Sequence, residues 1–341
     1  MRAVGFTRKA LPIEDPHALE DLVLPDPGPP QGHDLLVRVQ AVSVNPRDMK
    51  SRMSFEAAPE KPVVLGYDAS GVVAAVGPDC TLFRPGDAVI YAGVLDRQGS
   101  NAELQLVDER IVGRKPASLD HAAAASLPLT ALTAWEMLFD RLRIPRDAEG
   151  AGHVLLVIGG AGGVPSIAIQ LARVLTQVTV VATASRPESA AWVRQCGAHH
   201  VVDHSRPLPP QMEALEAGPC PWIFSTHTDA ARWAEMAMIL APQGSIGLID
   251  DPEPLDLRLL KFKSAAVHWE AMFTRPMFRT KDMVRQHEIL DEVAALVDAG
   301  RLRPTSARNV GPINAANLRR AHAAIESGRA VGKIVLAGFG G

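Results

Sequence analysis

The most distinctive pattern in the chain is an apolar run that leads into small residues and then into a helical stripe. Residues 154–158 read Val-Leu-Leu-Val-Ile, and residues 159–163 read Gly-Gly-Ala-Gly-Gly. Apolar residues then recur at 167, 168, 171, 172 and 175, a spacing that lies on one face of a helix. The pattern predicts a strand, a glycine turn and a helix, which together form a cradle for the pyrophosphate of a dinucleotide.

Backbone N–H groups would line this cradle, and the helix N-terminus would add partial positive charge. The residues expected to contribute are Gly160, Ala161, Gly162, Gly163 and Val164. Pro165 stands where the dinucleotide fingerprint has a third glycine that allows close helix–strand packing. A proline is tolerated in the first helical turn because its missing N–H would have no partner there. We therefore predict that the cradle persists; the alternative is a tight strand–helix turn that binds no ligand.

From about residue 120 onward, strand-like and helix-like segments alternate. After a helix near 121–142, strands are expected at 153–158, 178–183, 200–203, 222–226 and 245–249, and helices at 166–175, 187–196 and 229–240. Strands that alternate with helices of this length predict a parallel sheet.

The rest of the chain has a different pattern. Short β-rich runs at 35–42, 71–77 and 87–92 are separated by prolines and glycines, which predicts a compact β-barrel-like domain. Near the C-terminus we expect helices at about 282–300 and 314–327 and a final strand at 332–336. With a length of 341 residues, these patterns predict two domains.

Composition narrows the classes of function. An apolar fraction of 47%, a charged fraction of 21% and a net charge of −3 indicate an ordinary globular protein with no general attraction to nucleic acid or to an anionic membrane. No apolar run is expected to span a membrane, and the N-terminus lacks the core of a signal peptide. The cysteines Cys80, Cys196 and Cys220 are scattered and odd in number, so we expect no disulfide framework and a cytoplasmic location.

The residues that end the second predicted strand, at 178–183, indicate whether the site binds NAD or NADP. An NAD site of this type places an Asp or Glu there, about 20 residues after the glycines, to bind the ribose 2′-hydroxyl. Residues 182–186 instead read Ala-Thr-Ala-Ser-Arg. Thr183, Ser185 and Arg186 offer hydroxyl groups and a guanidinium, which suit a 2′-phosphate. The sequence predicts NADP(H). The alternative role of Ser185, which is compatible with this prediction, is to cap a helix that has Pro187 in its first turn.

Several longer runs resemble the medium-chain dehydrogenase/reductase superfamily. Residues 65–73 resemble its G-x-E-x-x-G-x-V turn, residues 83–89 resemble its F-x-x-G-D-x-V strand entry, and residues 99–103 and 332–336 also fit. More narrowly, the chain is similar to the quinone-oxidoreductase branch whose members are called zinc-type alcohol dehydrogenase-like proteins. The runs that carry this similarity are 227–229, 240–244, 250–252, 268–275 and 311–317.

The resemblance implies an α/β fold with two domains. A GroES-like, β-rich catalytic domain would comprise residues 1–126 and 266–341, and a Rossmann domain with a doubly wound parallel sheet would bind NADP(H) with residues 127–265. It also implies a homodimer formed through an edge strand of the Rossmann sheet.

The resemblance does not extend to a metal site. A catalytic zinc ion needs three Cys, His or carboxylate ligands and an open position. The zinc-dependent relatives have a Cys where this chain has Asn45, and a His-Glu pair where it has Tyr67 and Asp68. We therefore expect no bound metal.

Without a Lewis acid, the oxidation of a simple alcohol is difficult because the alkoxide needs strong stabilisation. Hydride transfer from NADPH to a quinone or an α,β-unsaturated carbonyl is easier, since the charge spreads over a conjugated system. The sequence predicts an NADPH-dependent reductase of small quinones or related conjugated carbonyls. The alternatives are an enoyl or 2-alkenal double-bond reductase and a non-catalytic NADPH-binding protein.

The resemblance places Tyr67 at the position of the missing metal. We hypothesise that Tyr67, Asn45 and Asp48 line the acceptor pocket and that Tyr67 hydrogen-bonds the developing oxyanion. A role as proton donor is the weaker hypothesis, because a pKa near 10 for an unperturbed tyrosine makes water a credible donor. The alternative is that Tyr67 only packs at a domain interface and that Asp48 caps a turn.

Further contacts with the cofactor are implied by the resemblance. The residues expected near the nicotinamide or its ribose are Thr130, Thr133, Thr226, Thr228, Ile249, Asp250, Phe273 and Thr274. His204 matches a position that reaches the adenosine phosphate, and Lys333 is expected to reach the cofactor from the returning domain. The alternatives are helix packing for Thr130 and Thr133, core packing for Phe273, and surface positions for His204 and Lys333.

Overall fold

The protein was analysed as a computed structural model, which describes residues 1–340 apart from the side chain of Ala307. The chain separates into two compact units. Unit 1 comprises Met1–Leu132 and Phe273–Gly341, and unit 2 comprises Thr133–Met272. The sequence analysis places these divisions after residues 126 and 265.

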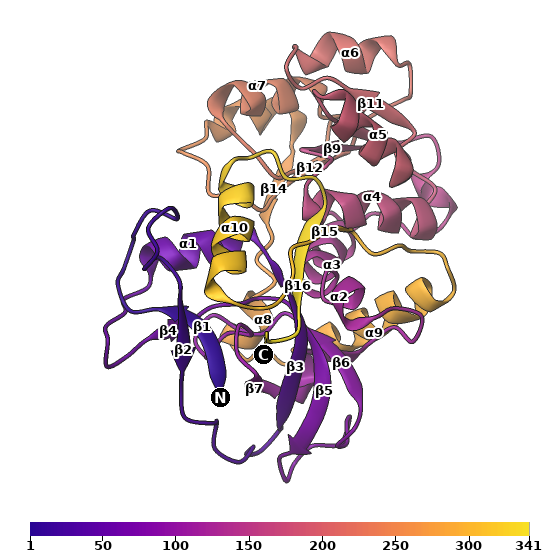
Figure 1. Ribbon diagram of the computed structural model, residues 1–341. Helices are drawn as coiled ribbons and strands as arrows, with labels where there is room; N and C mark the ends of the chain where they lie inside the picture. Colours follow the sequence, from indigo (N-terminus) through magenta and orange to yellow (C-terminus); the bar gives the residue numbers. More distant parts are fainter. Residues whose placement is uncertain (341) are drawn as a thin grey trace. The chain divides into compact units, whose positions relative to one another are not determined.

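Unit 2 is built on a six-stranded parallel sheet with the strand order β11-β10-β9-β12-β13-β14 (Figure 1). Its strands are β9 (Val154–Ile158), β10 (Thr179–Thr183), β11 (His200–Val202), β12 (Trp222–Ser225), β13 (Ser245–Leu248) and β14 (Ala266–Trp269). The order runs outward from β9 in one direction and from β12 in the other. The predicted Rossmann sheet is confirmed, and such sheets bind ligands at the carboxyl ends of the two strands where the order reverses.

Helices precede and connect these strands. They are η3 (Ala148–Gly150), α4 (Gly163–Leu175), α5 (Pro187–Gln195), α6 (Leu208–Ala214), α7 (Ala230–Ile239) and η4 (Leu257–Lys263). Trp233 and Met236 of α7 pack into a buried cluster with Leu156 and Ile158 of β9, while α4 contacts β9 and β10. Because β9 is buried along its whole length, its apolar run carries no alternation.

Strand β14 was missed by the sequence analysis, which assigns residues 266 onward to the catalytic domain. Ser245 to Leu248 of β13 pair in parallel with Ala266 to Trp269, so these residues belong to the sheet of unit 2. The strand has four residues and lies at the edge of the sheet, and its first and last side chains are exposed. A short edge strand therefore lacks the buried apolar run that identifies β9.

Unit 1 contains a seven-stranded sheet with the order β15-β16-β3-β5-β6-β8, in which β7 also pairs with β3, and a three-stranded sheet with the order β2-β1-β4. The strands are β1 (Arg2–Phe6), β2 (Glu20–Val23), β3 (Asp34–Val44), β4 (Val63–Val64), β5 (Ala69–Val76), β6 (Ala88–Tyr91), β7 (Leu104–Asp108), β8 (Val112–Arg114), β15 (Ser306–Asn309) and β16 (Lys333–Ala337). The C-terminal strand β16 pairs antiparallel with β3, with Ile334 opposite Val44. Residues far apart in the sequence thus meet at the end of β3.

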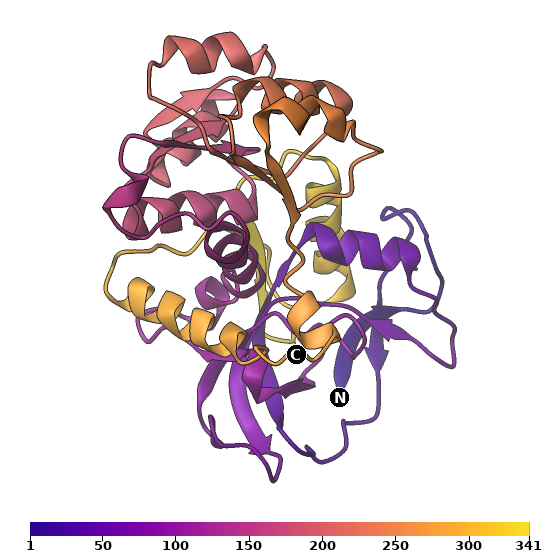
Figure 2. The ribbon, with the colours of Figure 1, turned by 180° about the vertical axis from the view of Figure 1, so that it is seen from behind.

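The helices of unit 1 are α1 (Pro46–Ser54), η1 (Glu109–Ile111), α2 (His121–Ala124), α8 (Thr274–Met277), α9 (Arg285–Asp298) and α10 (Ala315–Glu326). Helices α1 and α10 lie side by side (Figures 1 and 2), and the Arg52 guanidinium of α1 forms an ion pair of 2.6 Å with Glu326 of α10. This contact anchors α1, which carries candidate site residues.

The single helix predicted near 121–142 is divided. Helix α2 ends before Pro128, where α3 (Pro128–Trp135) begins, and α3 continues as a π-helix, η2 (Glu136–Arg141). The break agrees with the steric restriction that a proline places on the residue before it. By length and composition alone His121–Arg141 could cross a membrane, but 83% of its most apolar window is buried inside the protein.

Candidate functional site

The glycine turn after β9 is held in place by Thr183 at the end of β10. The backbone N–H of Gly159 donates to Thr183 Oγ1 at 2.9 Å, and the N–H of Gly160 donates to the Thr183 carbonyl at 3.0 Å. Gly159 has a φ of +77°, and a Cβ placed there would lie 2.4 Å from Thr226 Oγ1. Glycine is therefore required at position 159. Thr183, which is predicted to contact the cofactor, accepts hydrogen bonds that hold the glycine turn in place.

The turn presents unpaired backbone donors. Within the described residues, the N–H groups of Ala161, Gly163 and Val164 have no hydrogen-bond partner in the protein. Helix α4 begins at Gly163, so these donors lie at its N-terminus, and Gly162 is its N-cap. Unpaired N–H groups at a helix N-terminus are the donors that hold a phosphate.

Pro165 occupies the third position of α4, as expected for a proline in the first helical turn. The next residue closes the turn: the Ser166 hydroxyl donates to the Gly162 carbonyl at 2.6 Å. The indole N–H of Trp192 in α5 donates to the Ser166 hydroxyl at 2.8 Å. Hydrogen bonds to Ser166 thus join α4 to α5 beside the cradle.

The segment after β10 contains Ser185 and Arg186. Ser185 is exposed, and the N-cap of α5 is Arg186 rather than Ser185, with Pro187 as the first helical residue. The alternative in which Ser185 caps the helix is therefore wrong.

His204 is half-buried, and its Nδ1 lies 3.1 Å from Thr183 Oγ1. Burial and the nearby Arg232 guanidinium lower the pKa of His204, so the ring is neutral at pH 7.

The residues after β12 and β13 are joined by hydrogen bonds. Thr226 Oγ1 donates to the Ile158 carbonyl at 3.0 Å, next to the glycine turn. The Thr228 hydroxyl donates to Asp250 Oδ1 at 3.2 Å, and its backbone N–H donates to Asp250 Oδ2. Ile249 and Asp250 follow β13 directly. Thr226 and Thr228 follow β12, one of the two strands where the order of the sheet reverses, and Ile249 and Asp250 follow its neighbour β13. All four residues thus lie at the carboxyl ends of parallel strands, as predicted for ligand-binding positions.

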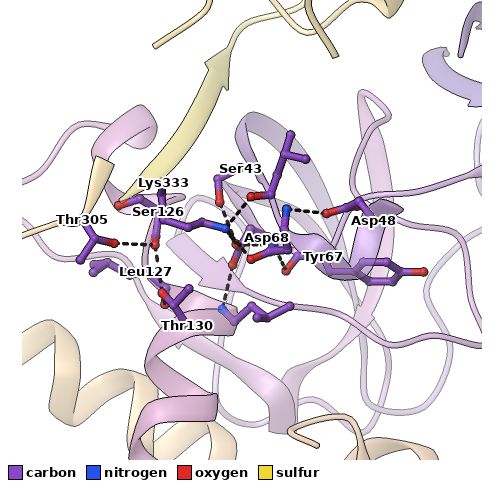
Figure 3. Close-up of polar contacts among 12 residues, drawn as sticks. Ser43, Asp48, Tyr67, Asp68, Ser126, Leu127, Thr130, Thr305 and Lys333 are labelled. Atoms are coloured by element: carbon purple, nitrogen blue, oxygen red, sulfur yellow. Dashed lines mark hydrogen bonds and ion pairs between the residues drawn. The ribbon is translucent and has the colours of Figure 1, made fainter. Parts of the chain in front are cut away.

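A buried polar cluster in unit 1 centres on the Asp68 carboxylate (Figure 3). Asp68 Oδ2 accepts hydrogen bonds from the Ser43 hydroxyl at 2.7 Å, from Asn45 Nδ2 at 2.8 Å and from Lys333 Nζ at 2.9 Å. Asp68 Oδ1 accepts from the backbone N–H of Leu129 in α3 at 2.8 Å. Every partner is buried or comes from the backbone, so this carboxylate is satisfied entirely by the protein.

The Lys333 ammonium is directed into this cluster. Its side chain is buried, and its Nζ donates to the Val44 carbonyl at 2.9 Å, to Asn45 Oδ1 and to Asp68 Oδ2. An ammonium has three N–H bonds, and all three have partners here. The alternative of a surface lysine is therefore wrong, and a contact between Lys333 and a cofactor stays a prediction.

Asn45 joins this cluster to helix α1. Asn45 is the N-cap residue, and its backbone N–H donates to Asp48 Oδ2 at 2.8 Å. Asp48 Oδ1 is buried and has no hydrogen-bond partner among the described residues. Burial raises the pKa of Asp48 to about 7. The structure thus joins Asn45 and Asp48 directly, and Asp48 also caps the start of α1.

Tyr67 points away from the Lys333–Asp68 pair (Figure 3). Its side chain is buried, its hydroxyl donates to Ser51 Oγ of α1 at 2.9 Å, and its ring packs edge-on against Phe273 at 5.4 Å. Arg47 Nε also donates to Ser51 Oγ, at 3.1 Å. Burial raises the pKa of Tyr67 to about 12, so the phenol stays protonated at neutral pH.

The remaining expected residues have local contacts. The Thr130 hydroxyl donates to the carbonyls of Ser126 and Leu127 at 3.2 and 3.0 Å, which agrees with helix packing. Thr133 is buried, and Thr274 is the first residue of α8. Phe273 packs against Tyr67, in agreement with a core position.

Sequence reasoning missed Ser43, Ser51 and Lys333 as partners of the candidate site residues. Ser51 lies three residues after Asp48, so the two side chains share one face of α1. The sequence contains a signal for the start of this helix, which could have been used to predict it. That signal is Asn45-Pro46, an N-cap residue and a proline at the first helical position. No local signal could have placed Lys333 beside Asp68, because the contact depends on the pairing of β16 with β3.

Comparisons with known proteins agree with this architecture. The alcohol dehydrogenase GroES-like domain family matches residues 31–117, and the zinc-binding dehydrogenase family matches residues 196–336. A zinc-type alcohol dehydrogenase-like protein of Staphylococcus aureus (strain MSSA476) is 40% identical over 98% of this chain and 99% of its own length. The human mitochondrial NAD(P)H oxidoreductase RTN4IP1 is 31% identical over 89% of this chain and 81% of its own length.

A solved structure extends the comparison. One solved crystal structure is of a Rhizobium etli CFN 42 protein whose name places it with the zinc-dependent alcohol dehydrogenases. Its sequence is 55% identical to this chain, and the two structures superpose with a TM-score of 0.96 over 100% of this chain and 98% of the other. This chain is an oxidoreductase of the medium-chain dehydrogenase/reductase superfamily and belongs to its zinc-type alcohol dehydrogenase-like proteins.

Proposed function

We propose that this protein is an NADPH-dependent reductase that transfers a hydride to quinones or related conjugated carbonyls without a catalytic metal ion. The observation that carries the proposal is the glycine turn, with unpaired N–H groups at Ala161, Gly163 and Val164 and no carboxylate at the end of β10. The human relative is named an NAD(P)H oxidoreductase, which agrees with a nicotinamide cofactor.

The residues that would hold the cofactor supply complementary charge. Backbone N–H groups of the turn would bind the pyrophosphate, and Ser185 and Arg186 would bind the 2′-phosphate through charge-assisted hydrogen bonds. Thr226, Thr228 and Asp250 would contact the ribose next to the nicotinamide, from the carboxyl ends of β12 and β13. The cofactor, when bound, supplies the hydride.

A zinc ion, which the family names imply, does not fit the residues present. Among the described residues, no group of three or more His, Cys, Asp or Glu side chains could hold a metal ion. At the positions matched with zinc ligands, Asn45 and Asp68 already bind the Lys333 ammonium. The acceptor is therefore expected to carry its own activation, as quinones and enones do.

The chain's own groups would handle the acceptor and its proton. Tyr67 keeps its phenolic proton at neutral pH. By exchanging its hydrogen bond to Ser51 Oγ for one to the acceptor, the phenol can donate to an oxygen that gains negative charge. Asp48, with a pKa raised to about 7, is partly protonated near neutrality and has a free Oδ1 among the described residues. We propose Tyr67 as the donor to the oxyanion, with Asn45 and Asp48 shaping the pocket around it.

Parallel assays test this function. We expect oxidation of NADPH with 1,4-benzoquinone and 9,10-phenanthrenequinone, at a higher kcat/KM than with a 2-alkenal and at a higher kcat/KM than with NADH. Faster reduction of the 2-alkenal would favour a double-bond reductase. Tight NADPH binding without turnover of any acceptor would favour a non-catalytic binding protein.

A charge substitution tests the cofactor assignment separately. Ser185→Asp places a carboxylate where the 2′-phosphate would bind, and we expect the ratio of kcat/KM for NADPH over NADH to fall by about tenfold or more, the equivalent of about 1.4 kcal/mol. Ala191→Glu adds the same charge to an exposed position of α5 and should leave the ratio unchanged. An unchanged ratio in Ser185→Asp would place the 2′-phosphate elsewhere.

We also propose that two copies associate through unit 2. Strand β14 is the last strand of its sheet, and edge strands offer unpaired backbone groups. The exposed large apolar side chains of unit 2 gather in η4, in β14 and at the end of α7; they are Met238, Leu257, Leu259, Phe262 and Trp269. The Lys263 ammonium of η4 donates to the Met238 carbonyl, so these segments adjoin. A second copy seated on β14 would cover this surface.

A further inference from the structure

The Lys333 side chain reaches a cage of oxygen atoms in the interior of unit 1. Its ammonium is surrounded by the Val44 carbonyl, the Asn45 amide oxygen and an Asp68 carboxylate oxygen. Lys333 is only 3% exposed and Asp68 is fully buried. A positive centre held by a carbonyl, an amide oxygen and a carboxylate has the oxygen environment that proteins use for hard metal cations.

The cage holds the first residues of two helices. Asn45 is the N-cap of α1, and Leu129, whose N–H binds Asp68 Oδ1, is the second residue of α3. A carboxylate at a helix N-terminus is favourable because of the helix dipole. Tyr67 immediately precedes Asp68, so the cage also restrains the backbone position of Tyr67 and thereby the hydrogen bond between its hydroxyl and Ser51. The position of the proposed oxyanion donor thus depends on this buried ion pair.

Removing one partner of a buried ion pair is costly because the other charge remains buried without compensation. Without the ammonium, Asp68 would keep the Ser43, Asn45 and Leu129 donors but lose its only positive partner among the described residues. The two acceptors at Val44 and Asn45 would also lose their donor. The cage would then be an empty cavity that is lined by oxygen atoms and carries the negative charge of Asp68.

We propose that the Lys333 ammonium is the resident cation of this site and the positioning residue for Asn45, Asp68 and Tyr67, in the role that a bound metal ion would otherwise fill. Truncation of Lys333 then opens a site that selects a small organic ammonium ion. The activity readout for this inference rests on the proposed function; the thermal readout does not.

Chemical rescue tests the proposal. Lys333→Ala removes three carbon atoms and the ammonium, a fragment that propylammonium replaces. We expect the variant to have a lower Tm and lower quinone turnover than the wild type, and propylammonium to restore at least half of both losses. Propanol, which has nearly the same size but no charge, should restore neither. Lys263→Ala is the matched control, because among the described residues Lys263 Nζ donates only to the Met238 and Leu240 carbonyls. Propylammonium should not alter the Tm or the turnover of this variant.

A second pair of variants covers the case in which Lys333→Ala does not fold. Lys333→Met leaves Asp68 without its cation, whereas the double variant Lys333→Met with Asp68→Asn removes both charges. We expect the double variant to melt at a higher temperature than Lys333→Met alone. The proposal is overturned if propylammonium and propanol act alike, if zinc rescues better than propylammonium, or if the double variant melts no higher than the single one. If the wild type reduces no quinone, the proposed function fails while the Tm measurements still decide the role of Lys333.

Discussion

At the scale of single residues, the two tyrosines of the chain provide a matched comparison. Tyr67 is buried and donates to Ser51, whereas Tyr91 is buried in β6 with a hydroxyl that has no partner among the described residues. Burial raises the pKa of both phenols. The two side chains therefore differ in their contacts rather than in their ionisation.

We predict that Tyr67→Phe lowers kcat/KM for quinones by about fivefold to tenfold, because one hydrogen bond contributes about 1 kcal/mol. Tyr91→Phe should leave kcat/KM unchanged. Steady-state kinetics with NADPH and several quinones measure both. Full turnover in Tyr67→Phe would refute a catalytic role for this phenol and leave it as a packing residue against Phe273.

Asp48 makes stability depend on pH. Its pKa is about 7 in the folded protein and about 3.9 when unfolded, so the folded state binds more protons between these values. Stability from this group is fully present below pH 4 and is lost as the pH rises through 7.

We predict that Asp48→Asn, which cannot ionise, gains stability relative to the wild type as the pH rises from 5 to 8. Thermal denaturation at the two pH values measures the change. Asp298→Asn is the control, because hydrogen bonds from Ser118 lower the pKa of Asp298 and place its titration below this range. A difference for Asp48→Asn that stays constant across the range would show that Asp48 titrates normally.

At the scale of the elements, the glycine turn depends on one backbone conformation. Gly159 and Gly152 both have a φ of +77°, but a Cβ at Gly159 would lie 2.4 Å from Thr226 Oγ1, whereas a Cβ at Gly152 would meet nothing within 4 Å. We predict that both alanine variants lower the Tm through backbone strain, about 1 kcal/mol or more each. Only Gly159→Ala should weaken NADPH binding measured by calorimetry. Equal NADPH affinity in the two variants would argue against a phosphate site at this turn.

The elements also show what sequence can predict. Strand β9, the glycine turn and α4 are recognisable because a buried parallel strand is uniformly apolar and its turn needs glycine. Strand β14 is short and lies at the edge, so it has no such signal. The residues that bind the Lys333 ammonium are farther still from prediction, because Val44, Asn45 and Asp68 meet it only through the pairing of β16 with β3.

The candidate site divides in the same way. The residues proposed to bind the pyrophosphate form one continuous segment, so the sequence predicts them together. The residues around Tyr67 come from separate elements, and the sequence predicts their identities without their partners: Ser51 for Tyr67, Lys333 for Asn45. A side chain's hydrogen-bond partner is a tertiary property, and the internal oxygen atoms that Lys333 binds could not be predicted from its place in the sequence.

At the scale of the whole molecule, the exposed apolar surface of unit 2 predicts association. Phe262 in η4 is 97% exposed, and Phe278 in unit 1 is 74% exposed. We predict that the wild type is a dimer by light scattering and that Phe262→Glu shifts it toward the monomer, because a charge would be buried in the interface. Phe278→Glu should leave the dimer intact. A monomeric wild type, or an equal effect of the two variants, would contradict association through this surface.

The central claim concerns the whole enzyme: NADPH supplies a hydride to an acceptor that no metal ion activates. The most direct measurement combines the zinc content of the purified protein with quinone turnover before and after dialysis against a chelator. We predict substoichiometric zinc and unchanged turnover with NADPH. One zinc ion per chain, with turnover that is lost on chelation and returns when zinc is added, would contradict the account.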